Sequence, residues 1–273
     1  MSTPRYDAAE IAAALGVASV SFLGGGAFGD TWRVDDRAVK IICVDGYPPE
    51  RVAREVAGLA RVTSPHVVRL LKAGEVSLGG RSRPALRFEF IDGGDLQDRL
   101  DAGDRPTPAQ AAGLLRGLLV GVRDLHAADG TVHRDIKPPN VGLRRGAWEQ
   151  PVLLDLGLAR SATEPTVTLY PSLVGTTAYM APEQLMQKRA RKAADLFAVG
   201  VTVRALLCGR HPFYDQGVDY TYDQALQKIQ AGPAPIPDGL PDAVVTVLDL
   251  LVKHAEHERG SATSNLRRLD GTP

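Results

Sequence analysis

The segment HRDIKPPN, residues 133–140, and the run VLLDLGL, residues 152–158, decide how this sequence is interpreted. The first segment places Asp135 and Asn140 in one short loop, and the second carries Asp155 after an apolar run. An enzyme that moves a phosphoryl group needs such a set. One carboxylate orients a hydroxyl nucleophile, while another carboxylate and an amide oxygen hold the metal ions that neutralise phosphate charge. The two segments therefore predict phosphoryl transfer from ATP.

The composition is that of an ordinary globular protein. The chain has 273 residues, of which 44% are hydrophobic and 23% charged, so it is long enough to bury a substantial core in one large domain or two lobes. Its 32 Lys and Arg balance 32 Asp and Glu. A neutral total argues against bulk attraction to nucleic acid or to an anionic membrane.

The two cysteines, Cys43 and Cys208, each lie in an apolar segment. Two cysteines exclude a disulfide framework and a Cys-rich metal site, and we expect two reduced thiols in the core of a cytoplasmic protein. No apolar run approaches the ~20 residues of a membrane span. The N-terminal residues carry acids where a secretory signal would carry basic residues, so no signal peptide is expected.

Hydrophobic periodicity divides the chain into a β-rich and an α-rich part. In the first part we expect helices over residues 7–15 and 50–62 and five strands, over 17–23, 29–34, 37–44, 66–76 and 85–91. After residues 92–94 long helical patterns follow, over 109–128, 192–209 and 244–255. The predicted organisation is an N-terminal helical extension (1–18), a β-rich lobe (19–91) and an α-rich lobe (92–273).

The segment LGGGAFG, residues 23–29, contains the pattern Gly24-x-Gly26-x-x-Gly29. Glycines let backbone amides approach phosphates closely. The pattern alone is weak, because Gly-rich turns occur in many hairpins and the dinucleotide-binding version lies between a strand and a helix. Here a strand follows, which favours a β-hairpin over a nucleotide.

Lys40 lies within a predicted strand and Glu55 on the following predicted helix. Taken singly, each is more often a solvated surface charge. Downstream of a glycine loop, Lys40 is instead placed to pair with the α- and β-phosphates, with Glu55 fixing its position.

The loop and the apolar run supply the candidate catalytic groups. Asp135 is the candidate for orienting the substrate hydroxyl and accepting its proton, although an isolated Asp is often only a turn or cap residue. Lys137 is placed to stabilise the transferring phosphate, and Asn140 and Asp155 to bind Mg²⁺. A carboxylate that ends an apolar strand is hard to explain as core packing, because desolvation costs several kcal/mol without a partner.

With these motifs in order, the chain resembles a eukaryotic-type serine/threonine protein kinase of the kind also found in bacteria. The resemblance runs from about residue 19 to residue 269. It rests on the glycine loop, the AVK lysine Lys40, the helix residue Glu55, HRDIKPPN, the triplet DLG at 155–157 and GTTAYMAPE at 175–183. It implies a bilobal α+β kinase fold, with a small five-stranded antiparallel lobe carrying one main helix and a larger, mainly α lobe.

The resemblance also implies roles for individual residues. For ATP binding these are Leu23, Gly24, Gly26, Gly29, Thr31, Ala38, Lys40, Phe88, Glu89, Ile91, Asp95 and Leu143. Thr176 corresponds to a threonine that contacts the catalytic aspartate and lysine, and with Lys137 it favours a serine or threonine acceptor. Glu183 and Arg259 correspond to a buried ion pair, and Asp195 to the helix residue that braces the HRD backbone; these three are structural.

Two positions depart from the family pattern. Thr31 stands where valine is usual after the glycine loop, and Leu156 where phenylalanine is common in the metal-binding triplet. Thr31 adds a hydroxyl beside the adenine and could alter nucleotide affinity, while Leu156 leaves Asp155 untouched.

The segment 159–180 is rich in hydroxyl side chains. It is either a solvated loop or an activation segment in which Arg134, beside Asp135, pairs with a phosphate. We expect autophosphorylation, with Thr168 the first choice and Thr166 the second.

The expected function is thus an ATP- and Mg²⁺-dependent protein serine/threonine kinase, with Mn²⁺ as the alternative ion. A pseudokinase scaffold would be expected to lack Lys40, Asp135 or Asp155, all of which are present. A small-molecule kinase shares the lobes but not GTTAYMAPE, which builds a peptide platform. The expected partners are ATP, protein substrates and a transient homodimer during autophosphorylation, with no nucleic acid and no membrane insertion.

Overall fold

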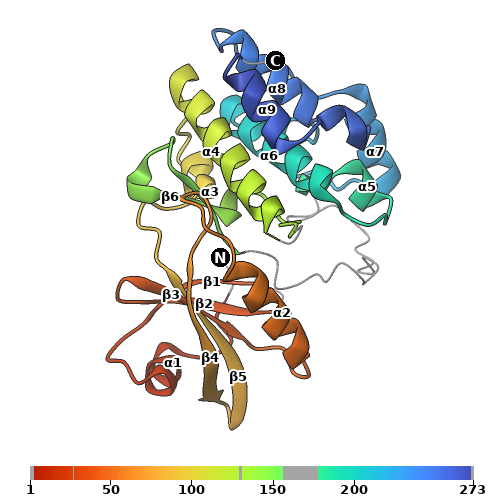
Figure 1. Ribbon diagram of the computed structural model, residues 1–273. Helices are drawn as coiled ribbons and strands as arrows, with labels where there is room; N and C mark the ends of the chain where they lie inside the picture. Colours follow the sequence, from red (N-terminus) through yellow and green to blue (C-terminus); the bar gives the residue numbers. More distant parts are fainter. Residues whose placement is uncertain (1–2, 27, 129–130, 156–177, 272–273) are drawn as a thin grey trace. The chain divides into compact units, whose positions relative to one another are not determined.

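The computed structural model describes residues 3–26, 28–128, 131–155 and 178–271. The chain divides into two compact units, one of residues 1–63 and 68–90 and the other of residues 64–67 and 91–273. Figure 1 shows the large sheet in the first unit and most helices in the second.

The first unit is a five-stranded antiparallel sheet with two helices. The strand order is β1-β2-β3-β5-β4. Its elements are α1 (Ala8–Leu15), β1 (Ser21–Gly25), β2 (Gly29–Val34), β3 (Arg37–Ile42), α2 (Pro49–Leu59), β4 (Leu70–Leu78) and β5 (Arg81–Glu89).

Helix α1 has clear start and stop signals. Asp7 caps it, since the Asp7 carboxylate accepts from the Glu10 N–H at 2.8 Å and the Glu10 carboxylate accepts from the Asp7 N–H at 3.2 Å. Gly16 ends it in the left-handed conformation at φ 66°. Ile11 is fully buried in the cluster that includes Trp32 and Ile41 of the sheet. Burial of Ile11 therefore fixes α1 to this unit.

The second unit is mainly helical, with one two-stranded sheet. Its elements are α3 (Leu96–Asp101), α4 (Pro108–Ala127), η1 (Pro138–Asn140), β6 (Val141–Leu143), η2 (Arg144–Gly146), β7 (Pro151–Leu153), α5 (Pro182–Leu185), α6 (Lys192–Cys208), α7 (Tyr222–Ala231), α8 (Asp242–Leu251), η4 (Glu256–Arg259) and α9 (Ala262–Leu269). Helices α4, α6, α8 and α9 pack against one another, and α4 also packs against β7 (Figure 1).

Helix α6 is the centre of this unit, because every residue from Ala194 to Leu207 is buried. An all-round buried helix shows no amphipathic stripe. Its two buried charged residues, Asp195 and Arg204, are both bonded: Arg204 makes an ion pair with Asp249 and donates to the Ala234 carbonyl at 3.2 Å. Buried charges need such partners.

Helix α4 approaches its neighbours closely at a glycine. A Cβ on Gly121 would lie 2.7 Å from the carbonyl oxygen of His66, so a larger residue would push the helix away. The His66 ring contacts the Pro151 carbonyl at 2.7 Å, and the Leu153 N–H donates to the His66 carbonyl at 2.9 Å. These contacts bind residues 64–67 to the second unit.

The predicted α+β fold with a five-stranded antiparallel sheet and a helical C-terminal part is confirmed. Three predicted strands are displaced along the chain: β1 is Ser21–Gly25 where 17–23 was expected, β5 is Arg81–Glu89 where 85–91 was expected, and β4 is Leu70–Leu78 where 66–76 was expected. Residues 66–69 therefore lie outside β4. Val67 instead makes an isolated parallel bridge with Leu153 in the second unit. Cys43 and Cys208 are both unpaired thiols, each partly rather than fully buried.

His211 lies in an aromatic cluster of the second unit. Its ring stacks on Tyr214 at 4.6 Å between centroids, and its Nδ1 accepts from the N–H groups of Phe213 and Tyr214, both at 3.2 Å. Burial lowers the pKa of His211 from the ordinary 6.5 to about 4. Protonation of Nδ1 would also break both hydrogen bonds.

We predict that His211 makes the fold sensitive to acid. Between about pH 4 and 6.5 the unfolded chain binds this proton and the folded chain does not, so the free energy of unfolding falls as the pH drops. The loss at about pH 5 is on the order of 2 kcal/mol. His211→Asn keeps an acceptor near the Nδ1 position without a titrating group, and urea denaturation at several pH values should show a shallower decline. Identical declines in the two proteins would contradict this.

Candidate active site

Two side chains of the HRDIKPPN segment, those of Lys137 and Asn140, contact the carboxylate of Asp135. Asp135 Oδ2 lies 3.0 Å from Lys137 Nζ and accepts from Asn140 Nδ2 at 2.9 Å. Asn140 Nδ2 also donates to the Asp135 carbonyl at 2.8 Å. The Asp135 side chain is 31% exposed, so it is accessible to solvent while the loop holds it in place.

A buried carboxylate on α6 fixes the backbone of this loop. Asp195 is fully buried, and its two oxygens accept from the N–H of Arg134 at 2.7 Å and of His133 at 2.9 Å. The His126 ring nitrogen Nε2 lies 2.8 Å from Asp195 Oδ2. Charge-assisted hydrogen bonds of this kind are about twice as strong as neutral ones. Asp195 thereby holds the residues that precede Asp135.

His133 connects the loop to the segment that carries Asp155. Its Nε2 lies 2.9 Å from the Leu154 carbonyl, which can only accept, so Nε2 carries the proton. Its Nδ1 then accepts from the Asp135 N–H at 3.3 Å. The Leu154 N–H donates to the Asn140 carbonyl at 2.9 Å. The positions of Asp135 and Leu154 are therefore coupled through a buried ring.

Two residues of this site hold left-handed backbone conformations without being glycine. These are Arg134 at φ 68° and Asp155 at φ 51°. Each such conformation costs on the order of 1–3 kcal/mol and persists only where the surroundings enforce it. For Arg134 the enforcing contact is the bond from its N–H to Asp195.

Asn140 and Asp155 together offer oxygen ligands. The amide oxygen of Asn140 takes no part in its bonds to Asp135, since the nitrogen makes both. The carboxylate of Asp155 follows β7 and is exposed. Across the described residues no group of three or more His, Cys, Asp or Glu forms a metal cage. A hard divalent ion held by few protein oxygens and completed by phosphates fits this donor set.

The segment LGGGAFG, residues 23–29, is called the glycine segment below; it lies in the first unit and extends from the end of β1 to the start of β2. A Cβ on Gly24 or Gly26 would meet nothing within 4 Å, whereas one on Gly29 would lie 1.9 Å from the Ile41 carbonyl oxygen. Gly29 is therefore required for the contact of β2 with β3. The Cys43 N–H donates to the Phe28 carbonyl at 2.8 Å, which fixes the far end of the loop to the chain after β3.

Lys40 lies in the middle of β3, with Thr31 of β2 and Leu86 of β5 as its neighbours. The side chain of Glu55, on α2, lies outside the described part of the chain, so the pairing expected with Lys40 stays a prediction. The other candidates in this unit are Leu23 on β1, Ala38 on β3 and Phe88 and Glu89 on β5. Ala38 and Phe88 are cross-strand partners.

Ile91, Asp95 and Leu143 lie in the second unit. Asp95 caps α3, because its Oδ1 accepts from the Asp98 N–H at 2.9 Å, and burial raises its pKa. The Leu143 N–H donates to the Gly94 carbonyl at 2.9 Å.

Several predicted residues lie outside the described residues. They are Leu156, Thr166, Thr168 and Thr176. Their expected roles stay predictions.

Glu183 and Arg259 form a bidentate buried ion pair. The two N–O distances are 2.7 and 2.9 Å, and the exposed fractions of the two side chains are 2% and 0%. Arg259 also donates to the carbonyls of Lys253, Ala193 and His254, at 2.8, 3.0 and 2.9 Å. Each of its donors has an acceptor, as a buried guanidinium requires.

The family of this chain is shown by its similarity to known proteins. A family model described as protein kinase domain matches residues 18–268. The chain belongs to the protein kinase domain family. The predicted resemblance to a eukaryotic-type serine/threonine kinase catalytic domain is confirmed, and the family uses ATP and a divalent metal ion.

Named relatives of this kinase domain include bacterial and human proteins. The serine/threonine-protein kinase PkaA of Streptomyces coelicolor is 34% identical over 90% of this chain and 48% of its own length. PknD of Mycobacterium tuberculosis is 28% identical over 81% of this chain and 35% of its own. The human calcium/calmodulin-dependent protein kinase type 1B is 29% identical over 90% of this chain and 72% of its own.

The kinase domain thus spans about half or less of the length of these bacterial relatives. None of the helices in the described ranges combines the length and the apolar character that crossing a bilayer requires.

Two contacts made by His126 and Arg5 were not predicted from the sequence. His126 lies in the last turn of α4 and contacts Asp195 of α6. Arg5 contacts the glycine segment from the N-terminal residues. No local motif marks either residue, because each acts through a contact distant in sequence.

We predict that Asp195→Asn lowers the free energy of unfolding by about 3 kcal/mol, because the amide turns a donor towards groups that also donate. Urea denaturation measures this. Asp270→Asn is the matched control: Asp270 pairs with Arg116 on the surface, where loss of the charge costs under about 1 kcal/mol. Equal losses in the two variants would contradict the role of Asp195.

Proposed function

We propose that this kinase domain transfers the γ-phosphoryl group of ATP to serine or threonine hydroxyls of proteins. The observation that carries the proposal is the cluster at Asp135, in which Lys137 and Asn140 both contact one carboxylate oxygen. The remaining oxygen of this partly exposed carboxylate is the one that orients the substrate hydroxyl and accepts its proton. Lys137 then stabilises the charge on the transferring phosphate.

For the nucleotide site we propose the residues that the family resemblance implies. The glycine segment offers backbone amides to the phosphates, and Lys40, positioned by Glu55, adds a positive charge. The adenine and ribose contacts come from Leu23, Thr31, Ala38, Phe88, Glu89, Ile91, Asp95 and Leu143. In this proposal residues 19–91 and 92–273 form one catalytic domain, and residues 1–18 are an N-terminal extension.

The metal ion is Mg²⁺, with Mn²⁺ as the alternative. Asn140 and Asp155 hold it through oxygen atoms, which both ions accept. When bound, the ion neutralises charge on the transferring phosphate.

The acceptor class follows from Lys137 and Thr176 together with the names of the relatives, which are serine/threonine-protein kinases. The further partners are protein substrates and a second copy of the chain during autophosphorylation, with no nucleic acid. We place the protein in the cytoplasm, a proposal supported by its two unpaired cysteines.

The decisive experiment incubates the purified chain with γ-labelled ATP, Mg²⁺ and a generic protein substrate. Wild-type protein should transfer label, and Asp135→Asn should reduce kcat by about 10²-fold or more with little change in affinity for ATP. Acid hydrolysis should recover phosphoserine or phosphothreonine. Asp101→Asn, an exposed residue near the end of α3, is the matched control and should keep full activity. Equal labelling by wild type and Asp135→Asn would sink the proposal.

Autophosphorylation is proposed at Thr168 first and Thr166 second, with Arg134 pairing with the phosphate. Phosphopeptide mapping of wild-type protein should find phosphate within residues 158–177, and Thr168→Ala should remove most of it and lower activity. Phosphate found only outside this segment would defeat the idea.

A further inference from the structure

The side chain of Arg5, among the N-terminal residues, contacts the glycine segment. Arg5 Nη2 donates to the carbonyl of Gly26 at 2.7 Å, and the Arg5 backbone N–H donates to Asp30 Oδ2 at 2.7 Å. Arg5 Nη1 also makes an ion pair with Asp30 Oδ1. Residues on both sides of the turn between β1 and β2 are therefore bound to one arginine.

Asp30 would destabilise the fold at this position if its carboxylate had no hydrogen-bonding partner. It follows Gly29 at the start of β2 and is fully buried. A buried carboxylate requires hydrogen-bonding partners, and one of its oxygens accepts from the Arg5 N–H while the other meets the Arg5 guanidinium. Arg5 is 39% exposed, so the pair lies at the edge of the buried region. The burial of Asp30 thus depends on the N-terminal residues being in place.

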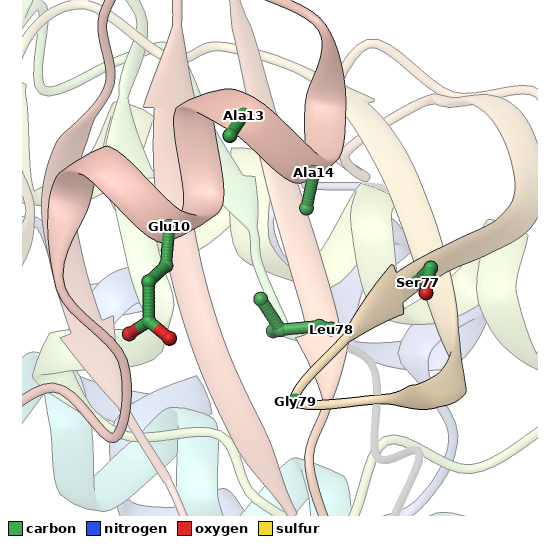
Figure 2. A pocket seen from close by; sticks show the side chains of 6 residues that line it. All are labelled: Glu10, Ala13, Ala14, Ser77, Leu78 and Gly79. Atoms are coloured by element: carbon green, nitrogen blue, oxygen red, sulfur yellow. The ribbon is translucent and has the colours of Figure 1, made fainter.

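The segment that carries Arg5 is itself firmly attached. Ile11 of α1 is fully buried against the sheet. The Tyr6 hydroxyl accepts from Arg83 Nη2 at 3.4 Å and would lie 3.3 Å from a Cβ built on Gly79. Figure 2 shows α1 beside the end of β4, where Glu10 and Leu78 line the same pocket. These contacts fix the position of the Arg5 backbone, and the Arg5 side chain extends from there to the turn between β1 and β2.

In the turn, Arg5 bonds the second of the two backbone polar groups of Gly26. The Gly26 N–H donates to the Gly29 carbonyl at 2.9 Å, and the Gly26 carbonyl accepts from Arg5. Both backbone groups of Gly26 are therefore engaged. Among the described residues, a Cβ built on Gly24 or Gly26 would meet nothing within 4 Å, and glycine leaves this backbone a wide range of conformations, so the two hydrogen bonds of Gly26 restrict it.

We propose that Arg5 is a positioning residue for nucleotide binding: by bonding Asp30 and the Gly26 carbonyl, it fixes the backbone at Gly26 and so the conformation in which the glycine segment receives the phosphates of ATP. This inference rests on the proposed function, in which the glycine segment binds ATP. A purely structural role would have Arg5 hold α1 on the sheet and leave nucleotide affinity alone. The two roles differ in what changes when Arg5 is replaced.

The test compares wild type with Arg5→Met and Arg5→Lys. The dissociation constant for MgATP is measured by calorimetry at a temperature where every variant is folded, and KM and kcat are measured alongside. Arg5→Met should weaken ATP binding by about tenfold and raise KM for ATP similarly, with kcat within about twofold of wild type. Arg5→Lys should lie between, because an ammonium keeps the charge beside Asp30 but lacks the fork that also reaches Gly26.

Ile11→Ala is the matched control from the same segment. It removes buried volume from α1 without touching the contacts of Arg5, so it should lower the melting temperature and leave the dissociation constant for ATP unchanged. Should Arg5→Met fail to fold, the comparison of Arg5→Lys with Ile11→Ala decides the question in the same way.

The outcomes separate the two claims. Wild-type affinity for ATP in folded Arg5→Met or, if that variant does not fold, in Arg5→Lys overturns the positioning role while leaving the proposed function intact. The same loss of affinity in Ile11→Ala as in the Arg5 variants also overturns it, since a general loosening of α1 would then suffice. A wild-type chain that binds no nucleotide overturns the proposed function and this inference together.

Discussion

The buried carboxylate of Asp195 is the contact on which the candidate active site depends. It accepts from the N–H groups of His133 and Arg134, and the His126 ring contacts it as well. A fully buried charge is tolerated only when its lone pairs are used, and here the partners are the backbone that leads to Asp135. The same interaction that makes the carboxylate stable therefore sets the geometry of the catalytic loop. It also supports the left-handed conformation of Arg134.

Most long elements of the fold, and the short helix α1, could be predicted from the sequence, whereas α7 and α9 could not. Helix α4 has a capping box at Thr107, Pro at its first position and a long apolar pattern, and each of these signals is local. Helices α7 and α9 have the same lengths as the predicted helices α8 and α1, 10 and 8 residues, but their sequences are more polar, so the apolar pattern is weaker; the caps at Thr221 and Ser261 are their local signals. The strand expected from residue 66 begins at Leu70, because residues 64–67 belong to the second unit. Tertiary contacts overrode local preference there.

In the candidate site too, some features could be predicted from the sequence and others could not. Asp135, Lys137 and Asn140 were predicted because they lie close together in sequence and their chemistry is complementary. The sequence could not predict that Asn140 would donate twice to Asp135, since that depends on the turn at 138–140. The contact of Arg5 with Asp30 could not be predicted either, because the two residues are 25 positions apart and only the packing of α1 brings them together. Contacts between distant residues leave no mark on local sequence pattern.

In our proposal, Asp195 fixes the loop that carries Asp135 and Asn140. Asn140 and Asp155 then hold the metal ion, and Asp135 orients the nucleophile. A crystal structure of the chain with Mg²⁺ and a non-hydrolysable ATP analogue tests this proposal most directly. The account predicts that Mg²⁺ is bound by the Asn140 amide oxygen and the Asp155 carboxylate, with the bonds from Asp195 to the loop unchanged. A metal–nucleotide complex bound at other residues, or Asn140 turned so that its nitrogen faces the metal, would contradict it.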